Sequence, residues 1–150
     1  MKEEIIKKSI EINAPKEKVW EVLLRDEYTR IWYAEFSEGT HAETDWKVGS
    51  KILFTDNSGS GLVSKVMVNK PFEAITIEHQ AAIIQGKEDV DSADAKNWKG
   101  CVETYLLSEK DGVTTLSIYN EMPEEYLEPF LLAWDKALPK IKELSESIVN

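Results

Sequence analysis

Apolar and polar residues alternate along most of the chain, and this period of two predicts strands with one buried face. In residues 4–12, isoleucines occupy one face, and lysine, serine and glutamate occupy the other. Further strands are predicted over residues 50–56, 62–69, 74–79 and 101–121. Alternation of this kind is typical of an antiparallel sheet that is buried on one side.

Turn-forming residues separate these predicted strands. Residues 57–61 (Asn-Ser-Gly-Ser-Gly) predict a hairpin loop, and Lys70-Pro71 ends a strand. Asp111-Gly112 predicts a two-residue hairpin turn, because both positions tolerate positive φ. The strands on either side of this turn place one alternating set on the inner face. That set is Val102, Thr104, Leu106, Leu116, Ile118 and Asn120.

Two short helices are predicted between the first strand and the rest of the sheet. Asn13 can cap the first helix, with Pro15 in its first turn. Asp26 can cap the second helix, which carries Trp32, and Gly39 marks its exit. These helices are too short to cover the sheet.

A long amphipathic helix is predicted over residues 123–148. Its apolar stripe keeps helical spacing. The stripe is Phe130, Ala133, Trp134, Ala137, Leu138, Ile141 and Leu144. Pro129 suits a first turn, whereas Pro139 removes a hydrogen bond to the carbonyl of Asp135 and predicts a kink.

Residues 81–99 follow no period, and we interpret them as a long acidic loop with one helical turn over 92–98. Such loops are uncommon inside a compact domain and are often functional. A solvated excursion without a function is the alternative.

The order of elements predicts an α+β fold in one domain over residues 1–150. A strand, two short helices, about six antiparallel strands and one long helix fit a curved sheet wrapped around that helix. Such a layout leaves a space at its wide end unless large side chains fill it. Trp20, Trp32, Phe54, Phe130 and Trp134 are the candidates to fill or to line it.

Charge and composition narrow the function. The net charge of −10 disfavours nucleic acids and anionic membrane surfaces. A single cysteine excludes an internal disulfide. Since the N-terminus lacks an apolar signal region and no apolar run is long enough for a membrane span, we expect a cytoplasmic protein.

Five segments together resemble a known family in their order and spacing. They are IEINAPKEKVWEVL (10–23), DWKVGSKILF (45–54), EAITIEH (73–79), DGVTTLSI (111–118) and AWDKALPKIKEL (133–144). The chain resembles the activator of heat-shock protein 90 ATPase homologue-like family, within the START/polyketide-cyclase (SRPBCC) helix-grip superfamily. The resemblance covers nearly the whole chain and implies a β-α-α-β6-α layout with a groove or cavity between sheet and terminal helix.

With the resemblance, the pattern indicates which side chains face this cavity. They are Trp32, Phe54, Ile75, Ile77, His79, Leu106, Ile118, Asn120, Phe130, Trp134 and Leu138. The first hypothesis is non-catalytic binding of a small hydrophobic or amphipathic ligand, without cofactor or metal, by a monomer or homodimer. The alternatives are a cyclase- or hydrolase-type enzyme that uses His79 and a chaperone-interacting stress-response module. The eukaryotic chaperone activators carry a further N-terminal domain, which this sequence lacks.

His79 is the strongest single candidate for a catalytic or ligand-orienting residue. An inward imidazole can orient a polar ligand group or transfer a proton near neutral pH. The alternative is a buried histidine with a structural hydrogen bond. Asn120 and Asp56 are its candidate partners from the parity of their strands.

Other titratable residues give weaker indications. A second group of candidates alternates along one predicted strand and would share a face: His41, Glu43 and Asp45. This pattern fits either a metal site or a solvent-exposed edge of the sheet. Cys101 has outward parity beside Glu103, and the nearby negative charge does not favour a thiolate. Residues 89–100 fail the calcium-loop pattern, which needs a glycine at its sixth position and a glutamate at its twelfth.

Overall fold

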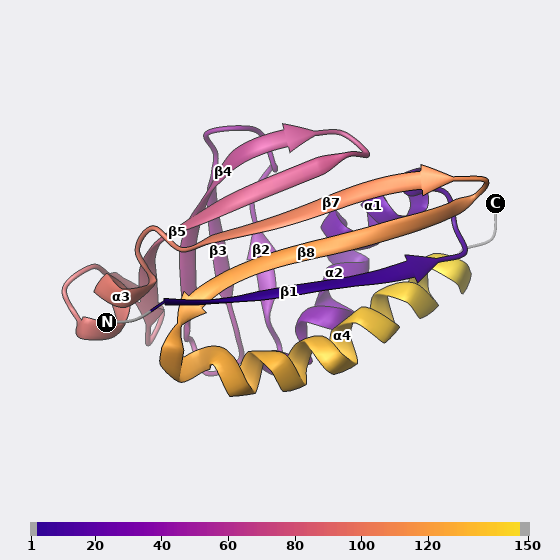
Figure 1. The fold of residues 1–150 in the computed structure, drawn as a ribbon. Coiled ribbons are helices and arrows are strands. Elements are labelled where there is room, and N and C mark those ends of the chain that lie inside the picture. Colours follow the sequence, from indigo (N-terminus) through magenta and orange to yellow (C-terminus); the bar gives the residue numbers. More distant parts are fainter. Residues whose placement is uncertain (1–2, 148–150) are drawn as a thin grey trace.

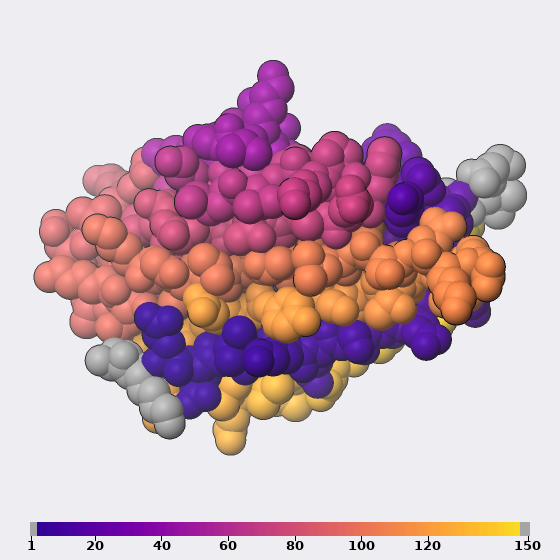
Figure 2. Space-filling view, turned by 45° about the horizontal axis from the view of Figure 1, so that its top comes forward, coloured from indigo at the N-terminus to yellow at the C-terminus, as the bar shows by residue number. Residues whose placement is uncertain are grey.

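The computed structural model describes residues 3–147, and its strands form one curved antiparallel sheet (Figure 1). The neighbours along the sheet are β1 (Glu3–Ile12), β8 (Val113–Pro123), β7 (Val102–Lys110), β5 (Ala74–Ile84), β4 (Gly61–Lys70), β3 (Lys51–Thr55) and β2 (His41–Glu43). The short strand β6 (Lys87–Asp89) pairs with β5 off this path. Figure 2 shows β1 in indigo beside the orange of β7 and β8, followed by the pink of β5 and β4.

Helices cover one side of this sheet. They are α1 (Lys16–Leu24), α2 (Asp26–Tyr33), α3 (Ala93–Trp98), the 3-10 turn η1 (Glu124–Tyr126) and α4 (Leu127–Ser147). Helix α4 runs along the sheet and contacts β1, α1 and α2 (Figure 1). The predicted α+β class and the grip of a sheet on a C-terminal helix are confirmed.

Alternation along the strands correctly predicted much of the inner face. Ile6 and Ile12 of β1 are buried, whereas Lys7 is exposed. The hairpin between β7 and β8 turns at Asp111 and Gly112, whose φ angles are 53° and 80°. These positive values explain why the turn needs residues that tolerate the left-handed region.

Strand β7 has the opposite phase to the one predicted. Tyr105 pairs with the buried Ile118, and Leu107 pairs with the buried Leu116. Residues directly opposite each other share a face, so Tyr105 and Leu107 point inward together with Glu103. Leu106 lies on the outer face and is 39% exposed, so its predicted place in the cavity is wrong. The same shift moves Val102 and Thr104 outward.

The predicted loop over residues 81–99 is largely wrong. Strand β5 continues to Ile84, turns at Gln85 and Gly86 and returns as β6. Ala81 and Ala82 are both buried, which explains why this part of the strand shows no alternation. The helical turn is confirmed as α3, where Ser92 Oγ accepts a hydrogen bond from the backbone N–H of Ala95 at 3.1 Å.

The predicted helix caps are also wrong. Pro15 and Arg25 hold the N-cap positions of α1 and α2, and neither forms a side-chain cap hydrogen bond. The backbone N–H of Asn13 instead donates to a carboxylate oxygen of Glu146 at 2.8 Å. This bond ties the end of β1 to the last turns of α4.

Helix α4 continues through Pro139 to Ser147. The buried positions Ala133, Trp134, Ala137, Leu138 and Ile141 confirm its predicted stripe. Both Pro139 and the residue one turn before it lie on the exposed side, where water can replace the hydrogen bond that proline removes. The kink at this position stays a prediction.

Candidate functional site

A pocket of about 400 Å³ lies between the inner face of the sheet, the end of α2, helix α3 and the first turns of α4. Aromatic side chains dominate its walls. They are Trp32, Tyr33, Phe36, Trp46, Phe54, Trp98, Tyr105, Tyr126, Phe130 and Trp134. Ten of the chain's fourteen aromatic residues therefore line one space.

The rings contact one another around this space, mostly edge to face. The centroid of Trp134 lies 6.0 Å from that of Trp32 and 4.9 Å from that of Phe36. Trp98 lies 5.8 Å from Phe130. Aromatic quadrupoles favour such tilted geometries over flat sandwiches, so the walls are held by their own contacts.

Aliphatic residues from strands β4 and β5 complete the walls. Leu62 comes from β4, and Ile75, Ile77 and Ile83 come from β5. The polar members with a charged or amide side chain are His79, Glu103, Asn120, Asp56 and Asp94. The pocket is thus apolar with a few polar groups at fixed places, as ligand pockets usually are.

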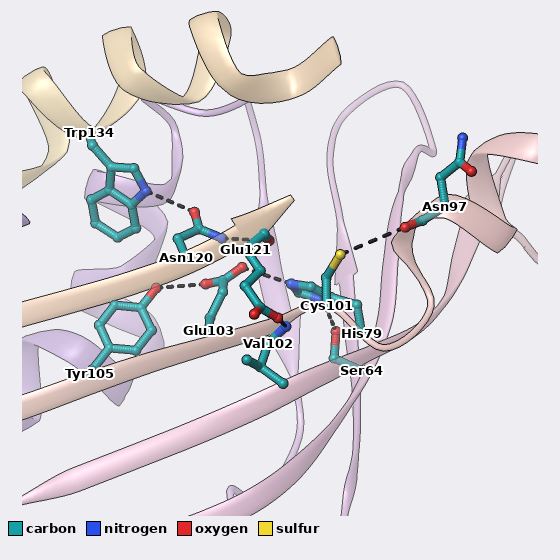
Figure 3. Close-up of polar contacts among 10 residues, drawn as sticks. All are labelled: Ser64, His79, Asn97, Cys101, Val102, Glu103, Tyr105, Asn120, Glu121 and Trp134. Atoms are coloured by element: carbon teal, nitrogen blue, oxygen red, sulfur yellow. Dashed lines mark hydrogen bonds and ion pairs between the residues drawn. The ribbon is translucent and has the colours of Figure 1, made fainter. Parts of the chain in front are cut away.

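His79 is buried on β5 and is held at both ring nitrogens (Figure 3). Its Nδ1 lies 2.7 Å from Ser64 Oγ, and its Nε2 lies 2.9 Å from Glu103 Oε1. Both contacts are satisfied when the Ser64 hydroxyl donates to Nδ1 and the Nε2–H donates to Glu103. The Trp98 ring meets the imidazole edge-on, with the centroids 5.3 Å apart.

Glu103 links this histidine to a tyrosine on its own strand. The second carboxylate oxygen of Glu103 accepts the Tyr105 hydroxyl at 2.9 Å. Burial raises the pKa of Tyr105 well above its ordinary value, and the negative charge of Glu103 raises it further. Burial, followed by the charge of Glu103, likewise raises the pKa of Tyr33. Both phenols therefore stay protonated and can act only as neutral hydrogen-bonding groups.

Asn120 joins the sheet to α4, and its side-chain hydrogen bonds go to residues other than His79. The indole N–H of Trp134 donates to Asn120 Oδ1 at 2.9 Å, and the amide of Asn120 donates to the carbonyl of Glu121 at 3.2 Å. The prediction that Asn120 is a partner of His79 is wrong. Its amide instead fixes the orientation of the largest ring on the helix.

Asp56 is not a partner of His79 either. Its carboxylate accepts hydrogen bonds from the side chain of Ser37 at 2.6 Å, from the side chain of Ser58 at 2.6 Å and from the backbone N–H of Ser60 at 3.1 Å. Burial alone would raise the pKa of Asp56, but these hydrogen bonds outweigh it and lower the pKa to about 2. The result is an ionised carboxylate where the β3–β4 loop meets the segment after α2.

Eight of the eleven residues predicted for the cavity line this pocket. They are Trp32, Phe54, Ile75, Ile77, His79, Asn120, Phe130 and Trp134. Ile118 and Leu138 are buried in the core but do not reach the pocket wall, and Leu106 is on the outer face. Sequence reasoning missed Glu103 and Tyr105, although the two-residue turn at 111–112 fixes a register that pairs Glu103 with Asn120.

The weaker candidates form no site. Across residues 3–147, no three His, Cys, Asp or Glu side chains lie close enough together to hold a metal ion. His41 Nδ1 lies 3.2 Å from the carbonyl of Gly39, and its Nε2 lies 3.5 Å from Thr55 Oγ1. His41 therefore contacts neutral oxygens on its own edge of the sheet.

Cys101 is fully buried, so its predicted outward position is wrong. Burial raises the pKa of its thiol to about 12, and the charges of Glu3, Glu121 and Glu103 contribute in the same direction. The prediction that this residue does not favour a thiolate is confirmed. None of the helices in the described part of the chain combines the length and the apolar character needed to cross a membrane.

Solved structures share this fold. The solution structure of the Aha1 dimer from Colwellia psychrerythraea has a TM-score of 0.73 at 20% identity and covers 96% of this chain and 97% of that chain. Protein CV1439 from Chromobacterium violaceum has a TM-score of 0.70 at 21% identity over 96% and 98% of the two chains. Protein MLL2253 from Mesorhizobium loti has a TM-score of 0.76 at 14% identity over 97% and 100%.

Sequence comparison identifies the family. No curated protein matches the chain. The sequence profile described as "Activator of Hsp90 ATPase homolog 1-like protein" matches residues 13–146, which include α1, α2, strands β2 to β8 and nearly all of α4. The chain therefore belongs to the Activator of Hsp90 ATPase homolog 1-like family.

Proposed function

We propose that this protein binds a small apolar or amphipathic molecule in the pocket between the sheet and α4. One observation carries the proposal: ten aromatic residues surround a space of about 400 Å³ that they do not fill. This volume lies within the range of roughly 300–1,000 Å³ that is common for small-molecule sites. Members of the helix-grip superfamily often bind hydrophobic ligands, which agrees with the proposal.

The polar groups in the walls would orient the ligand. Glu103 and the hydroxyl of Tyr105 lie on the sheet side of the pocket, and Asp94 and Tyr126 lie at the end formed by α3 and η1. Tyr126 donates to Asp94 at 2.7 Å. A ligand with an apolar body and one polar end could bury the body among the rings and place its polar end against one of these groups.

Nucleophilic catalysis by a serine has no support in this geometry. Ser64 is hydrogen-bonded to His79, but its side chain is fully buried and lies outside the pocket wall. Attack on a bound molecule requires the hydroxyl to reach a reacting atom within about 3–3.5 Å. The Ser64–His79–Glu103 chain thus acts as a support that holds the Glu103 carboxylate in place.

A matched pair of tryptophan variants tests the proposal. Leu62→Trp adds a ring on β4 inside the pocket, whereas Leu106→Trp adds the same ring on the outer face. Probes would be a fatty acid, a long-chain amine, a flavonoid and an aromatic polyketide, with thermal shift for screening and calorimetry for affinity. We expect at least one probe to bind the wild type and Leu106→Trp, and to bind Leu62→Trp about tenfold more weakly or not at all.

Two results would contradict the proposal. One is the absence of binding by any probe to the wild-type protein. The other is equal affinity for the two variants, because a ligand in this pocket must compete with the added ring of Leu62→Trp.

A further inference from the structure

The carboxyl groups of the pocket point to the charge of its ligand. Among residues 3–147, those that line the wall include Asp56, Asp94 and Glu103, together with a single histidine and no lysine or arginine. An anionic molecule would therefore meet acidic groups with no cation to pair with. A fatty acid or another carboxylate is the wrong chemistry for this wall.

We propose that the pocket selects a cationic amphiphile, that is, a protonated amine on an aromatic or aliphatic body, with Glu103 as its counter-ion. This inference rests on the proposed function and adds the charge of the ligand to it. Three features of the wall support it.

The first feature is the position of the Glu103 carboxylate. The side chain is 15% exposed and lies in the pocket wall, between His79 and Tyr105 (Figure 3). One oxygen contacts His79 Nε2 and the other accepts the Tyr105 hydroxyl. A carboxylate has about four lone-pair sites, so each oxygen can still accept a hydrogen bond from a bound ammonium group.

The second feature is the aromatic surface around this carboxylate. The ring of Trp134 lies 6.0 Å from that of Tyr105, and Tyr105 lies 6.4 Å from Trp32. The negative faces of such rings attract a cation, as in the aromatic cages that bind alkylated ammonium groups. Aromatic rings give no comparable attraction to an anion.

The third feature is the surrounding charge. Hydrogen bonds from Ser37, Ser58 and Ser60 outweigh burial and keep Asp56 ionised, and the whole chain carries a net charge of −10. The summed field of an acidic protein draws cations towards a cleft and repels anions from it. The near and distant charges therefore act in the same direction.

Three probes of similar size and different charge test the inference. They are naphthylmethylamine, which is cationic near neutral pH, naphthylmethanol, which is neutral, and naphthoate, which is anionic. Calorimetry on the whole chain would give the three affinities. We expect the amine to bind about tenfold more tightly than the alcohol, and naphthoate to bind about tenfold more weakly than the alcohol.

Two variants assign the effect to the pocket carboxylate. Glu103→Gln should reduce the ratio of amine to alcohol affinity to about one. Glu143→Gln removes the same charge from an exposed side chain on α4 and should leave the ratio unchanged. Circular dichroism would show that each variant is folded.

The outcomes separate this inference from the proposed function. Binding of the alcohol with no preference for the amine would overturn the cationic ligand and leave the binding pocket standing. A preference that survives Glu103→Gln would overturn the assignment of Glu103. If Glu103→Gln does not fold, the affinities of the three probes for the wild type still decide the charge of the ligand. No binding by any of the three, together with none in the wider panel, would contradict both proposals.

Discussion

The two halves of helix α4 meet the rest of the protein in different ways. In the C-terminal half, the fully buried Ala137 and Ile141 pack in one core cluster with Val19 of α1. In the N-terminal half, Phe130 and Trp134 face the pocket. The closed half packs as a protein core usually does, whereas the rings of the open half border a space of about 400 Å³. One continuous helix therefore closes the core over one half of its length and lines a pocket over the other.

The largest effect is expected at the boundary between these halves. Trp134→Ala should lower the free energy of unfolding by about 3–5 kcal/mol, because the ring is 1% exposed and its indole N–H bonds Asn120. Trp134→Phe keeps a ring without the donor and should cost about 1–2 kcal/mol. Urea denaturation of both variants measures this. A loss below about 1 kcal/mol for Trp134→Ala would mean that this half of α4 does not dock as described.

The next prediction separates stability from binding. Ile141→Ala, in the closed half, should cost about 2–4 kcal/mol because it leaves a cavity in a packed cluster. It should not change the affinity for any probe that binds the pocket. Phe130→Ala removes a half-buried ring from the pocket wall and should cost roughly 1 kcal/mol but weaken probe binding about tenfold. Similar losses of affinity in both variants would remove the distinction between the halves.

A smaller effect is expected at the pocket end formed by the β3–β4 loop. The folded-state pKa of Asp56 is about 2, below the ordinary value of 3.8. A depressed carboxyl pKa contributes stability that is fully present above the ordinary value and is lost as pH falls from there through the folded value. We expect about 1–2 kcal/mol from Asp56, after allowance for solvent screening.

Unfolding of the wild type and Asp56→Asn as a function of pH measures this contribution. The difference between them should be largest at neutral pH and should shrink as the pH falls from 3.8 towards 2. A difference that stays constant over that interval would show that the hydrogen bonds from the serines do not depend on the charge of Asp56.

The smallest effect is a change in titration. Burial is the main reason that the pKa of Tyr105 is raised, and the charge of Glu103 is the second. Glu103→Gln should therefore lower the pKa of Tyr105 without returning it to its ordinary value. Tyr126, whose pKa is raised to about 12 by burial and by Asp94, is the internal control. Tyrosine ring signals followed by NMR at high pH should show a lower pKa for Tyr105 in Glu103→Gln and an unchanged pKa for Tyr126.

The sequence predicted the elements that repeat a simple period over several residues. The isoleucines of β1, the stripe of α4 and the turn at Asp111-Gly112 could all be predicted because each depends on local spacing or local φ. The continuation of β5 could not, because Ala81 and Ala82 are both buried and a strand covered on both faces loses its alternation.

The centre of the candidate site was hidden by the polarity of Glu103. A glutamate on a strand is usually solvated, and this expectation set the phase of β7 wrongly. Glu103 points inward because His79 of β5 and Tyr105 of its own strand supply hydrogen bonds there. The position of His79 depends on the pairing of β5 with both β4 and β7, which no local pattern encodes. The two-residue turn at 111–112 fixes the register between β7 and β8, and this register places Glu103 opposite Asn120 on the inner face. The inward phase of β7 therefore follows from the turn.

The pairing of β1 with β8 sets the order in which the chain can complete its sheet during synthesis. The register joins Glu3 to Pro123 and Ile12 to Thr114, so these partners are separated by most of the chain. Among the described strands, β8 is the sole neighbour of β1 in the sheet. The isoleucine face of β1 therefore leaves the ribosome long before its partner strand and α4 exist, and long-range pairing of this kind slows folding. A nascent chain that is stalled before β8 should expose this face, and pulse proteolysis of stalled chains should show β1 becoming protected only after β8 and α4 have emerged.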